Sequence, residues 1–239
     1  MVLVTTSNFQ QTIEVGDPIS QAKIFDAQSA DELVLLDLDA SKNKRGTLIN
    51  VIKTVAEQIF IPLTVGGGVK SIEDFKLLLV NGADKISINE IAIKSPDIIN
   101  QASRKFGSST VVISIDYKFV DGENLVYFKG GKEKTKMDPL KWAIECEKRG
   151  AGEILLTSID RDGTKSGLDI EMIKKVSSSV RIPVIASGGC GQAAHFSDGY
   201  LKGNVQAISA GTHFCFKDEG FMQVRAHIKN AGIPIRIHT

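Results

Sequence analysis

Two glycine-rich turns have the composition of phosphate-binding loops. The first contains Gly67 and Gly68 within residues 64–68, and the second contains Gly188 and Gly189 within residues 186–191. Each turn follows an apolar run and precedes an amphipathic stretch, so its backbone N–H groups and the start of a helix can face an anion. A tight turn from strand to helix also uses glycine, and for either turn alone this alternative stays open. Because the two turns occupy matching positions of an internal repeat, they favour a ligand with two phosphates. Residues after the next strand in each half, Asn89, Ala210 and Gly211, extend the two candidate sites.

Acidic residues that follow predicted strands are candidates for general acid or base catalysis. Asp37 and Asp39 follow one strand, Asp116 follows a second, and Asp160 and Asp162 follow a third. A carboxylate at a strand end can transfer protons once its surroundings shift its pKa, but an Asp there also often caps the next helix. Asp39 and Asp160 fit a structural role, in helix capping or loop bracing, as well as they fit a catalytic role. The residues after Asp116 continue as an extended hairpin and leave no helix to cap.

Charged residues also lie at the opposite ends of three predicted strands. Glu32, Lys85 and Glu153 each stand at the start of a strand, which is the N-terminal face of a barrel. Charges on that face normally concern stability or solubility, and from the residues alone this is the role we expect.

Short apolar runs that alternate with amphipathic stretches must position these residues. The predicted strands are 33–38, 63–65, 85–88, 111–116, 153–158, 184–186 and 207–210, and the predicted helices are about 19–30, 47–58, 71–81, 95–105, 138–149, 170–179, 192–201 and 220–231. Continuously apolar strands are typical of a parallel sheet whose two faces are covered. Strict alternation without a linker predicts an α/β fold, either a doubly wound sheet or a barrel.

An internal repeat of 121 residues favours the barrel. Glu32 and Glu153, Gly68 and Gly189, and the Ile-Pro pairs at 61–62 and 182–183 are each separated by 121 positions. A repeat of this length is half of a large domain. We therefore predict one α/β domain, a (β/α)8 TIM barrel with half-barrels at about 1–105 and 106–239, and the 239 residues suit such a barrel.

The first half-barrel lacks an opening strand. The second half opens with the predicted strand 111–116, whose counterpart would fall before Met1. We expect either a chain shortened by the choice of start site or residues 2–5 to fill the gap. Segment 118–137, with an Asp-Gly turn at 121–122, is predicted to form a β-hairpin over the C-terminal face, and residues 2–9 are its rough counterpart.

The composition excludes several classes of function. The chain is 42% apolar and 24% charged, and 29 basic against 28 acidic residues give a net charge of +1. A net charge this small produces no long-range electrostatic field that would attract nucleic acid or an anionic membrane. No apolar run reaches the roughly 18 residues of a membrane-spanning helix. Cys146, Cys190 and Cys215 lack CxxC spacing, and the four histidines lack an HExxH pattern. We expect reduced thiols in a cytoplasmic protein without a signal peptide, and neither a metal nor a cofactor.

Several runs of residues together resemble a known family. The most specific is LTSIDRDGTKSG at 156–167, and the others include 64–68, 82–85, 106–108, 149–153 and 182–189. Over essentially its whole length the chain resembles the cyclase subunit of imidazole glycerol phosphate synthase, the HisF type of histidine biosynthesis. The resemblance implies a barrel that binds the bisphosphate phosphoribulosyl-formimino-AICAR phosphate. Ammonia from a glutaminase subunit docked at the N-terminal face would attack it, giving imidazole glycerol phosphate and AICAR.

The resemblance also implies roles for individual residues. Asp116 would be one of two catalytic aspartates, and Lys85, Glu153 and Glu32 would belong to charges that gate the ammonia entrance next to the partner. The first phosphate group would be bound by Gly67, Gly68 and Asn89, and the second by Asp162, Gly163, Gly188, Gly189, Ala210 and Gly211, with Thr157 and Ser187 lining the pocket.

Three departures from the family pattern leave alternatives open. The strand that would carry the second catalytic aspartate is absent, Thr5 and Thr6 stand where the loop before Asn8 usually carries a lysine, and Glu90 replaces a phosphate-binding threonine. A carboxylate beside a dianion is repulsive unless it points away. One alternative is a related branch that channels ammonia for amidination of a nucleotide-linked sugar acid in surface-polysaccharide synthesis. Another is a non-catalytic scaffold that activates the glutaminase.

Overall fold

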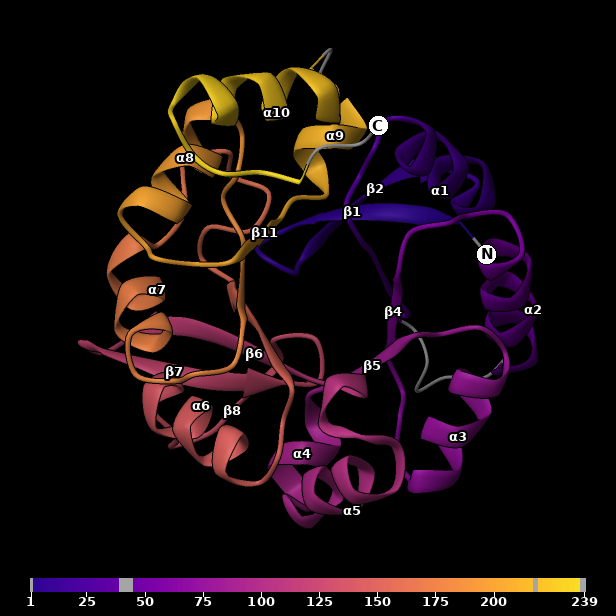
Figure 1. Ribbon diagram of the computed structural model, residues 1–239. Coiled ribbons are helices and arrows are strands. Elements are labelled where there is room, and N and C mark those ends of the chain that lie inside the picture. The colour runs from indigo at the N-terminus through magenta and orange to yellow at the C-terminus, as the bar shows by residue number, and fades with distance from the viewer. Residues whose placement is uncertain (1, 39–44, 217–218, 237–239) are drawn as a thin grey trace.

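Seven parallel strands form the central sheet of the part of the chain that the structure describes. The computed structural model describes residues 2–38, 45–216 and 219–236. The parallel strands are β3 (Leu33–Leu36), β4 (Leu63–Gly66), β5 (Lys85–Ile88), β6 (Val111–Val120), β9 (Glu153–Ser158), β10 (Val184–Ser187) and β11 (Ala207–Ser209). Their order in the sheet follows the sequence from β3 to β11. The sheet curls into the ring of Figure 1, with the helices on the outside, as in a (β/α)8 TIM barrel.

The outer ring consists of helices, and four of the longer ones have a side-chain cap at the first turn. The longer helices are α1 (Pro18–Ala27), α2 (Arg45–Ala56), α3 (Ile72–Val80), α5 (Asp97–Phe106), α6 (Pro139–Lys148), α7 (Ile170–Ser177), α8 (Ala193–Leu201) and α10 (Phe221–Asn230). Asp17, Ser71, Asp138 and Asp169 accept a hydrogen bond from a backbone N–H in the first turn of the helix that follows each of them. Pro18 and Pro139 start their helices, where the missing N–H costs nothing.

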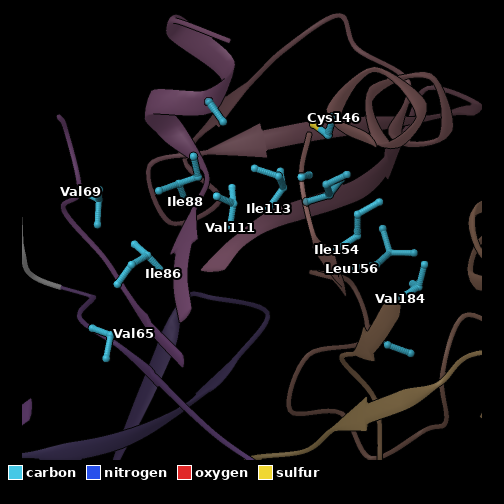
Figure 2. Close-up of a cluster of buried hydrophobic side chains, with 14 of the residues drawn as sticks. Val65, Val69, Ile86, Ile88, Val111, Ile113, Cys146, Ile154, Leu156 and Val184 are labelled. Carbon is cyan, nitrogen blue, oxygen red and sulfur yellow. The ribbon is translucent and has the colours of Figure 1, made fainter. Parts of the chain in front are cut away.

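Alternation along the strands divides the apolar core into an outer and an inner part. Side chains such as Val65, Ile86, Ile113 and Ile154 belong to the large cluster between sheet and helices (Figure 2). The residues between them in sequence point to the opposite face, because successive side chains of a strand alternate. Inside the ring, a small separate cluster contains Val112, Leu155 and Ile185, with Val34 packed against it.

In the described ranges, two β-hairpins extend from this barrel. One joins β6 to β7 (Glu123–Phe128), with a short addition from β8 (Glu133–Lys134). Its turn residues Asp121 and Gly122 have φ values of 54° and 89°, as an Asp-Gly hairpin turn requires. The other hairpin joins β1 (Leu3–Ser7) to β2 (Gln11–Gly16) and extends across the ring toward the β11 side (Figure 1).

Most predicted strands and helices are observed within a few residues of their predicted bounds. The prediction that β6 would end at residue 116 was too short, because the hairpin is continuous with the barrel strand. Three short helical segments were not predicted: α4 (Glu90–Lys94), α9 (Thr212–Phe216) and the 3-10 turn at Ser108–Thr110. Their few residues contain no full apolar period.

The alternative that residues 2–5 fill the place of a barrel strand was wrong. The backbone of β1 pairs in antiparallel fashion with β2, and β3 and β11 form the two edges of the described parallel sheet. These edge strands are also the less buried ones, whereas every residue of β4 is buried. Asp39 lies outside the described residues. No helix in the described ranges has the length and apolar character needed to cross a membrane.

Candidate active site

The carboxyl ends of three neighbouring strands bring predicted site residues together. In the register of the sheet, Asp116 of β6 lies opposite Thr157 of β9, and Thr157 lies opposite Ser187 of β10. These positions continue the inward-facing series that includes Val112, Leu155 and Ile185 below them. The structure therefore places a buried carboxyl group and two hydroxyl groups side by side at the C-terminal end of the barrel interior.

Asp116 is held by two hydrogen-bond donors in a buried setting. The Ser114 hydroxyl lies 3.0 Å from its Oδ1, and the Asn89 amide nitrogen lies 3.2 Å from its Oδ2. Burial raises the pKa of Asp116 to about 7; the hydrogen bond from Ser114 lowers it, and the nearby charge of Asp162 raises it. A carboxyl group with this pKa can both accept and release a proton near neutral pH.

Asp162 lies in the loop after β9 and is contacted by the β1–β2 hairpin. The Thr6 hydroxyl donates to its Oδ2 over 2.6 Å, and the backbone N–H of Asn8 donates to its carbonyl oxygen over 2.9 Å. Burial raises the pKa of Asp162, while hydrogen bonds from Thr6 and the backbone of Phe9 oppose the shift. The hairpin of the first half thus reaches the candidate site of the second half.

The same hairpin fits tightly against the loop that begins at Ile159. The amide of Asn8 donates to the carbonyl oxygens of Ile159 and Asp160, at 3.1 and 2.8 Å. A Cβ on Gly163 would lie 2.3 Å from the carbonyl oxygen of Thr6, so a larger residue would push the hairpin away. Gly163 therefore has a packing role in this arrangement, next to the phosphate-binding role that the sequence predicts.

The two glycine turns occupy equivalent places after β4 and β10. Gly67 and Gly188 have φ values of 98° and 90°. A Cβ on either would collide with the end of the neighbouring strand, at the carbonyl oxygen of Asp37 directly after β3 or of Ser158 at the end of β9. Close packing thus accounts for one glycine in each turn.

Other glycines of the turns differ in what surrounds them. A Cβ on Gly189 would lie 2.1 Å from the carbonyl oxygen of Gly167. Gly211, in contrast, has no atom of the described residues within 4 Å of such a Cβ. Ala210 and Gly211 connect β11 to α9, so packing does not explain a glycine at position 211, which leaves room for a ligand.

Asn89 lies between β5 and α4, and Glu90 is the first residue of α4. The Asn89 amide donates to the carbonyl oxygens of Ser114 and Tyr127, both at 3.1 Å, in addition to Asp116. Glu90 pairs with Lys94 one turn later, at 2.5 Å. Gly68 belongs to the neighbouring turn after β4. The amide of Asn89 therefore points toward the candidate catalytic group, and the charge of Glu90 is balanced by a lysine.

The three predicted charged residues meet at the other end of the barrel. The ammonium group of Lys85 lies 2.6 Å from Glu153 and 2.9 Å from Glu32. Burial opposes the charge on Lys85, but the hydrogen bonds that it donates to both carboxylates outweigh this effect, so the pKa of Lys85 is raised. One cation between two anions, with Lys85 and Glu153 largely shielded from solvent, forms a compact charged cluster at the N-terminal face.

Asp160 braces the second hairpin. Its Oδ2 accepts from the backbone N–H of Phe119 over 2.8 Å, and Lys118 lies 4.0 Å away. Of the two roles left open for Asp160, the structure supports loop bracing. The cysteines Cys146, Cys190 and Cys215 are free thiols, and the described ranges contain no group of three or more potential ligands that could hold a metal ion.

Four residues of the site were missed by the sequence analysis. Ser114 precedes Asp116 by two positions, and strand alternation alone places it on the same face. Thr6 and Asn8 contact a loop more than 150 residues away, which no local pattern indicates. Arg161 donates to the carbonyl oxygen of Gly167 over 3.2 Å and lies beside Gly189, so it adds a positive charge near the second glycine turn.

Comparisons with known proteins agree on one family. The model of the family described as "Histidine biosynthesis protein" matches residues 1–219. The chain is 46% identical to the imidazole glycerol phosphate synthase subunit HisF of Flavobacterium johnsoniae, over 96% of this chain and 92% of that protein. It is 43% identical to the HisF of Methanococcus vannielii, over 98% and 94%. It is 47% identical to the HisF of Clostridium botulinum, over 96% and 92%.

Proposed function

The chain belongs to the histidine biosynthesis protein family, and from this premise we propose that it is the cyclase subunit of an imidazole glycerol phosphate synthase. In this reaction ammonia attacks phosphoribulosyl-formimino-AICAR phosphate, and the product is cleaved and closed to imidazole glycerol phosphate and AICAR. The ammonia comes from a glutaminase subunit. The observation that carries the proposal is Asp116, a buried carboxyl group with a pKa of about 7 at the C-terminal end of the barrel interior.

Asp116 acts as the proton-transfer group of this proposal. Addition of ammonia, cleavage and ring closure each require a proton to leave nitrogen or to reach a departing group. A group whose pKa lies near the working pH serves both directions. Asn89 and Ser114 fix the two carboxylate oxygens, so the proton is exchanged at a defined place.

The two glycine turns hold the two phosphate groups of the substrate. The first group is assigned to Gly67, Gly68 and Asn89, and the second to Asp162, Gly163, Gly188, Gly189, Ala210 and Gly211. Arg161 supports the second site, because its side chain lies beside Gly189 and supplies a positive charge. Asp116, Thr157 and Ser187 lie at the strand ends between these turns, where the middle of the substrate would react.

The charged cluster at the N-terminal face is the proposed entry for ammonia and the docking side for the glutaminase. Lys85 lies at the start of β5, and Ser87 follows it on the same face of the strand. Thr64 and Ser114 are buried hydroxyl residues of β4 and β6 at comparable depth. Among the described residues, the Thr64 hydroxyl has no hydrogen-bond partner and can therefore bind a passing donor such as ammonia.

Turnover with free ammonium tests the proposed function without any partner. The wild-type chain should release AICAR from the bisphosphate when an ammonium salt replaces glutamine. Asp116→Asn should lower kcat by about 10²- to 10⁴-fold, the usual effect of a general acid or base. Asp160→Asn is the matched control, since Asp160 braces a hairpin at the same face and should leave kcat nearly unchanged. Full activity of Asp116→Asn would contradict the assignment.

One observation favours a second candidate function. Glu90 follows Asn89 and brings a carboxylate next to the first proposed phosphate site, although Lys94 balances its charge. A substrate with a different group there would suit the branch that delivers ammonia for amidination of a nucleotide-linked sugar acid. If this gene, together with the glutaminase, lets a histidine auxotroph grow, the protein acts in the histidine pathway. If the auxotroph does not grow and the ammonium assay shows no turnover, the result favours the polysaccharide-amidation branch.

A further inference from the structure

Asp116, Ser114 and Asn89 form a closed ring of hydrogen bonds. The Ser114 hydroxyl binds Asp116 Oδ1, the Asn89 amide nitrogen binds Asp116 Oδ2, and the same nitrogen binds the Ser114 carbonyl oxygen at 3.1 Å. We propose that Ser114 is a positioning residue for the reaction, which fixes the orientation of the Asp116 carboxylate by donating to Oδ1. This inference rests on the proposed function, because it assumes that Asp116 transfers protons.

The surroundings of Ser114 support an active role for its hydroxyl. Ser114 is buried and lies two residues before Asp116 on the inward face of β6, so both side chains point into the barrel. In the register it lies opposite Leu155, an apolar residue of the inner cluster, so Asp116 is the polar partner that its hydroxyl reaches. A buried hydroxyl that donates to a carboxylate stabilises the ionised form.

The groups that face Asp116 from the packed elements set the electrostatic balance. Asn89 approaches from the end of β5, Thr157 lies beside it on β9, and the backbone of Tyr127 on β7 accepts from Asn89. Among the described residues, Asp162 in the loop after β9 is a charged side chain that acts on Asp116, and its negative charge opposes ionisation of Asp116. Ser114 is therefore a donor whose hydrogen bond to Asp116 counteracts both burial and the charge of Asp162.

Loss of the Ser114 hydroxyl should move the titration of Asp116 in one direction. Without this donor the ionised form is less stable, so the pKa of Asp116 rises further above its ordinary value. The shift should be about one pH unit, because a hydrogen bond to a charged group corresponds to roughly one to two units. The pKa of Asp116 rises whether this group accepts or donates the proton in the reaction. The pH-dependent limb of kcat therefore moves to higher pH in either case.

The experiment compares Ser114→Ala with Ser114→Thr, which keeps the hydroxyl, and with Ser114→Cys, which keeps the size but donates weakly. Ser177→Ala is the control, since Ser177 is also buried and its hydroxyl donates to the carbonyl oxygen of Gly203, outside the site. The full-length chain is labelled with ¹³C-carboxyl aspartate and titrated by NMR, and the Asp116 signal is assigned by its loss in Asp116→Asn. The kcat–pH profile with ammonium is measured in parallel.

We expect the NMR titration midpoint of Asp116 and the pH-dependent limb of kcat to move to higher pH in Ser114→Ala and Ser114→Cys. In Ser114→Thr both should stay at their wild-type values. At the pH optimum kcat should fall several-fold in Ser114→Ala while the KM for the bisphosphate changes little, because Ser114 acts on the reaction through Asp116. An unchanged NMR midpoint in both Ser114→Ala and Ser114→Cys overturns the inference. The proposed function fails by a different result, full turnover of Asp116→Asn, so the two failures are distinguishable.

Discussion

Replacement of Lys85 by methionine should destabilise the barrel and uncouple it from its partner. The ammonium group of Lys85 lies between Glu153 and Glu32, at 2.6 and 2.9 Å. Methionine keeps most of the side-chain volume but leaves two carboxylates facing each other at the end of the barrel. One of them, Glu153, is largely shielded from water, so its charge is costly without a partner.

The expected cost lies between the values for buried and exposed ion pairs. Removal of one partner of a buried pair costs about 3–5 kcal/mol, whereas exposed pairs contribute about 0.2–1 kcal/mol. The side chains of Lys85 and Glu153 are 15% and 16% exposed, but Glu32 is 42% exposed and its interaction is screened by solvent. We therefore expect Lys85→Met to lower the free energy of unfolding by about 2–3 kcal/mol.

The pH dependence of this contribution follows from the raised pKa of Lys85. A lysine whose pKa is higher in the folded state contributes stability fully below its unfolded pKa, near 10.4, and loses it as the pH rises through the folded value. The difference between wild type and Lys85→Met should thus be constant from pH 7 to 9 and shrink above pH 10.

Urea unfolding followed by circular dichroism measures this difference. Lys175→Met is the control, since Lys175 forms an exposed pair with Glu171 on the outside of α7 and should show no measurable change. The double variant Lys85→Met/Glu153→Gln should recover part of the lost stability, because it removes the stranded carboxylate. Equal or greater destabilisation in the double variant would refute the electrostatic reasoning. Turnover with ammonium should remain while turnover with glutamine and the partner falls.

Two further substitutions test long-range contacts of β6 and of the loop after β9, the segments that carry Asp116 and Asp162. Tyr117→Phe removes a buried hydroxyl that donates to Asp169 over 2.9 Å, and urea unfolding should show a loss of about 1–3 kcal/mol. Gly163→Ala places a Cβ 2.3 Å from the Thr6 carbonyl oxygen, so limited proteolysis should cut the β1–β2 hairpin faster than in wild type. Gly211→Ala is the control, because the space around its Cβ is open and the proteolysis rate should not change. Equal rates in wild type, Gly163→Ala and Gly211→Ala would show that the hairpin contact is not maintained in solution.

The barrel core was predictable because its pattern is local. Apolar runs such as Lys85–Ile88 and Glu153–Ser158 identified their strands at the observed bounds, and the repeat assigned them to two half-barrels. The meeting of Lys85 with Glu32 and Glu153 was predicted from the family resemblance, since composition and position alone indicated only a role in stability or solubility.

The arrangement around Asp116 was less accessible from the sequence. Asn89 was assigned to a phosphate, but the direction of its amide depends on the backbone of the turn after β5 and on acceptors from β6 and β7. Thr6 and Asn8 contact the loop after β9 and so join segments about 150 residues apart. Neither segment has a sequence pattern that predicts this contact. Such contacts form only in the tertiary structure, so local propensity and hydrophobic periodicity do not predict them.

Those long-range contacts connect the hairpin to the chemistry of the site through charge. The Thr6 hydroxyl opposes the rise in the pKa of Asp162 and so favours its ionised form. The charge of Asp162 in turn raises the pKa of Asp116. The hydrogen bond from Thr6 therefore favours the form of Asp162 that makes Asp116 bind its proton more tightly, whereas burial of Asp162 acts in the opposite direction. A hydroxyl group of the first half-barrel is thus linked to the proton affinity of a carboxyl group in the second through one intervening carboxylate.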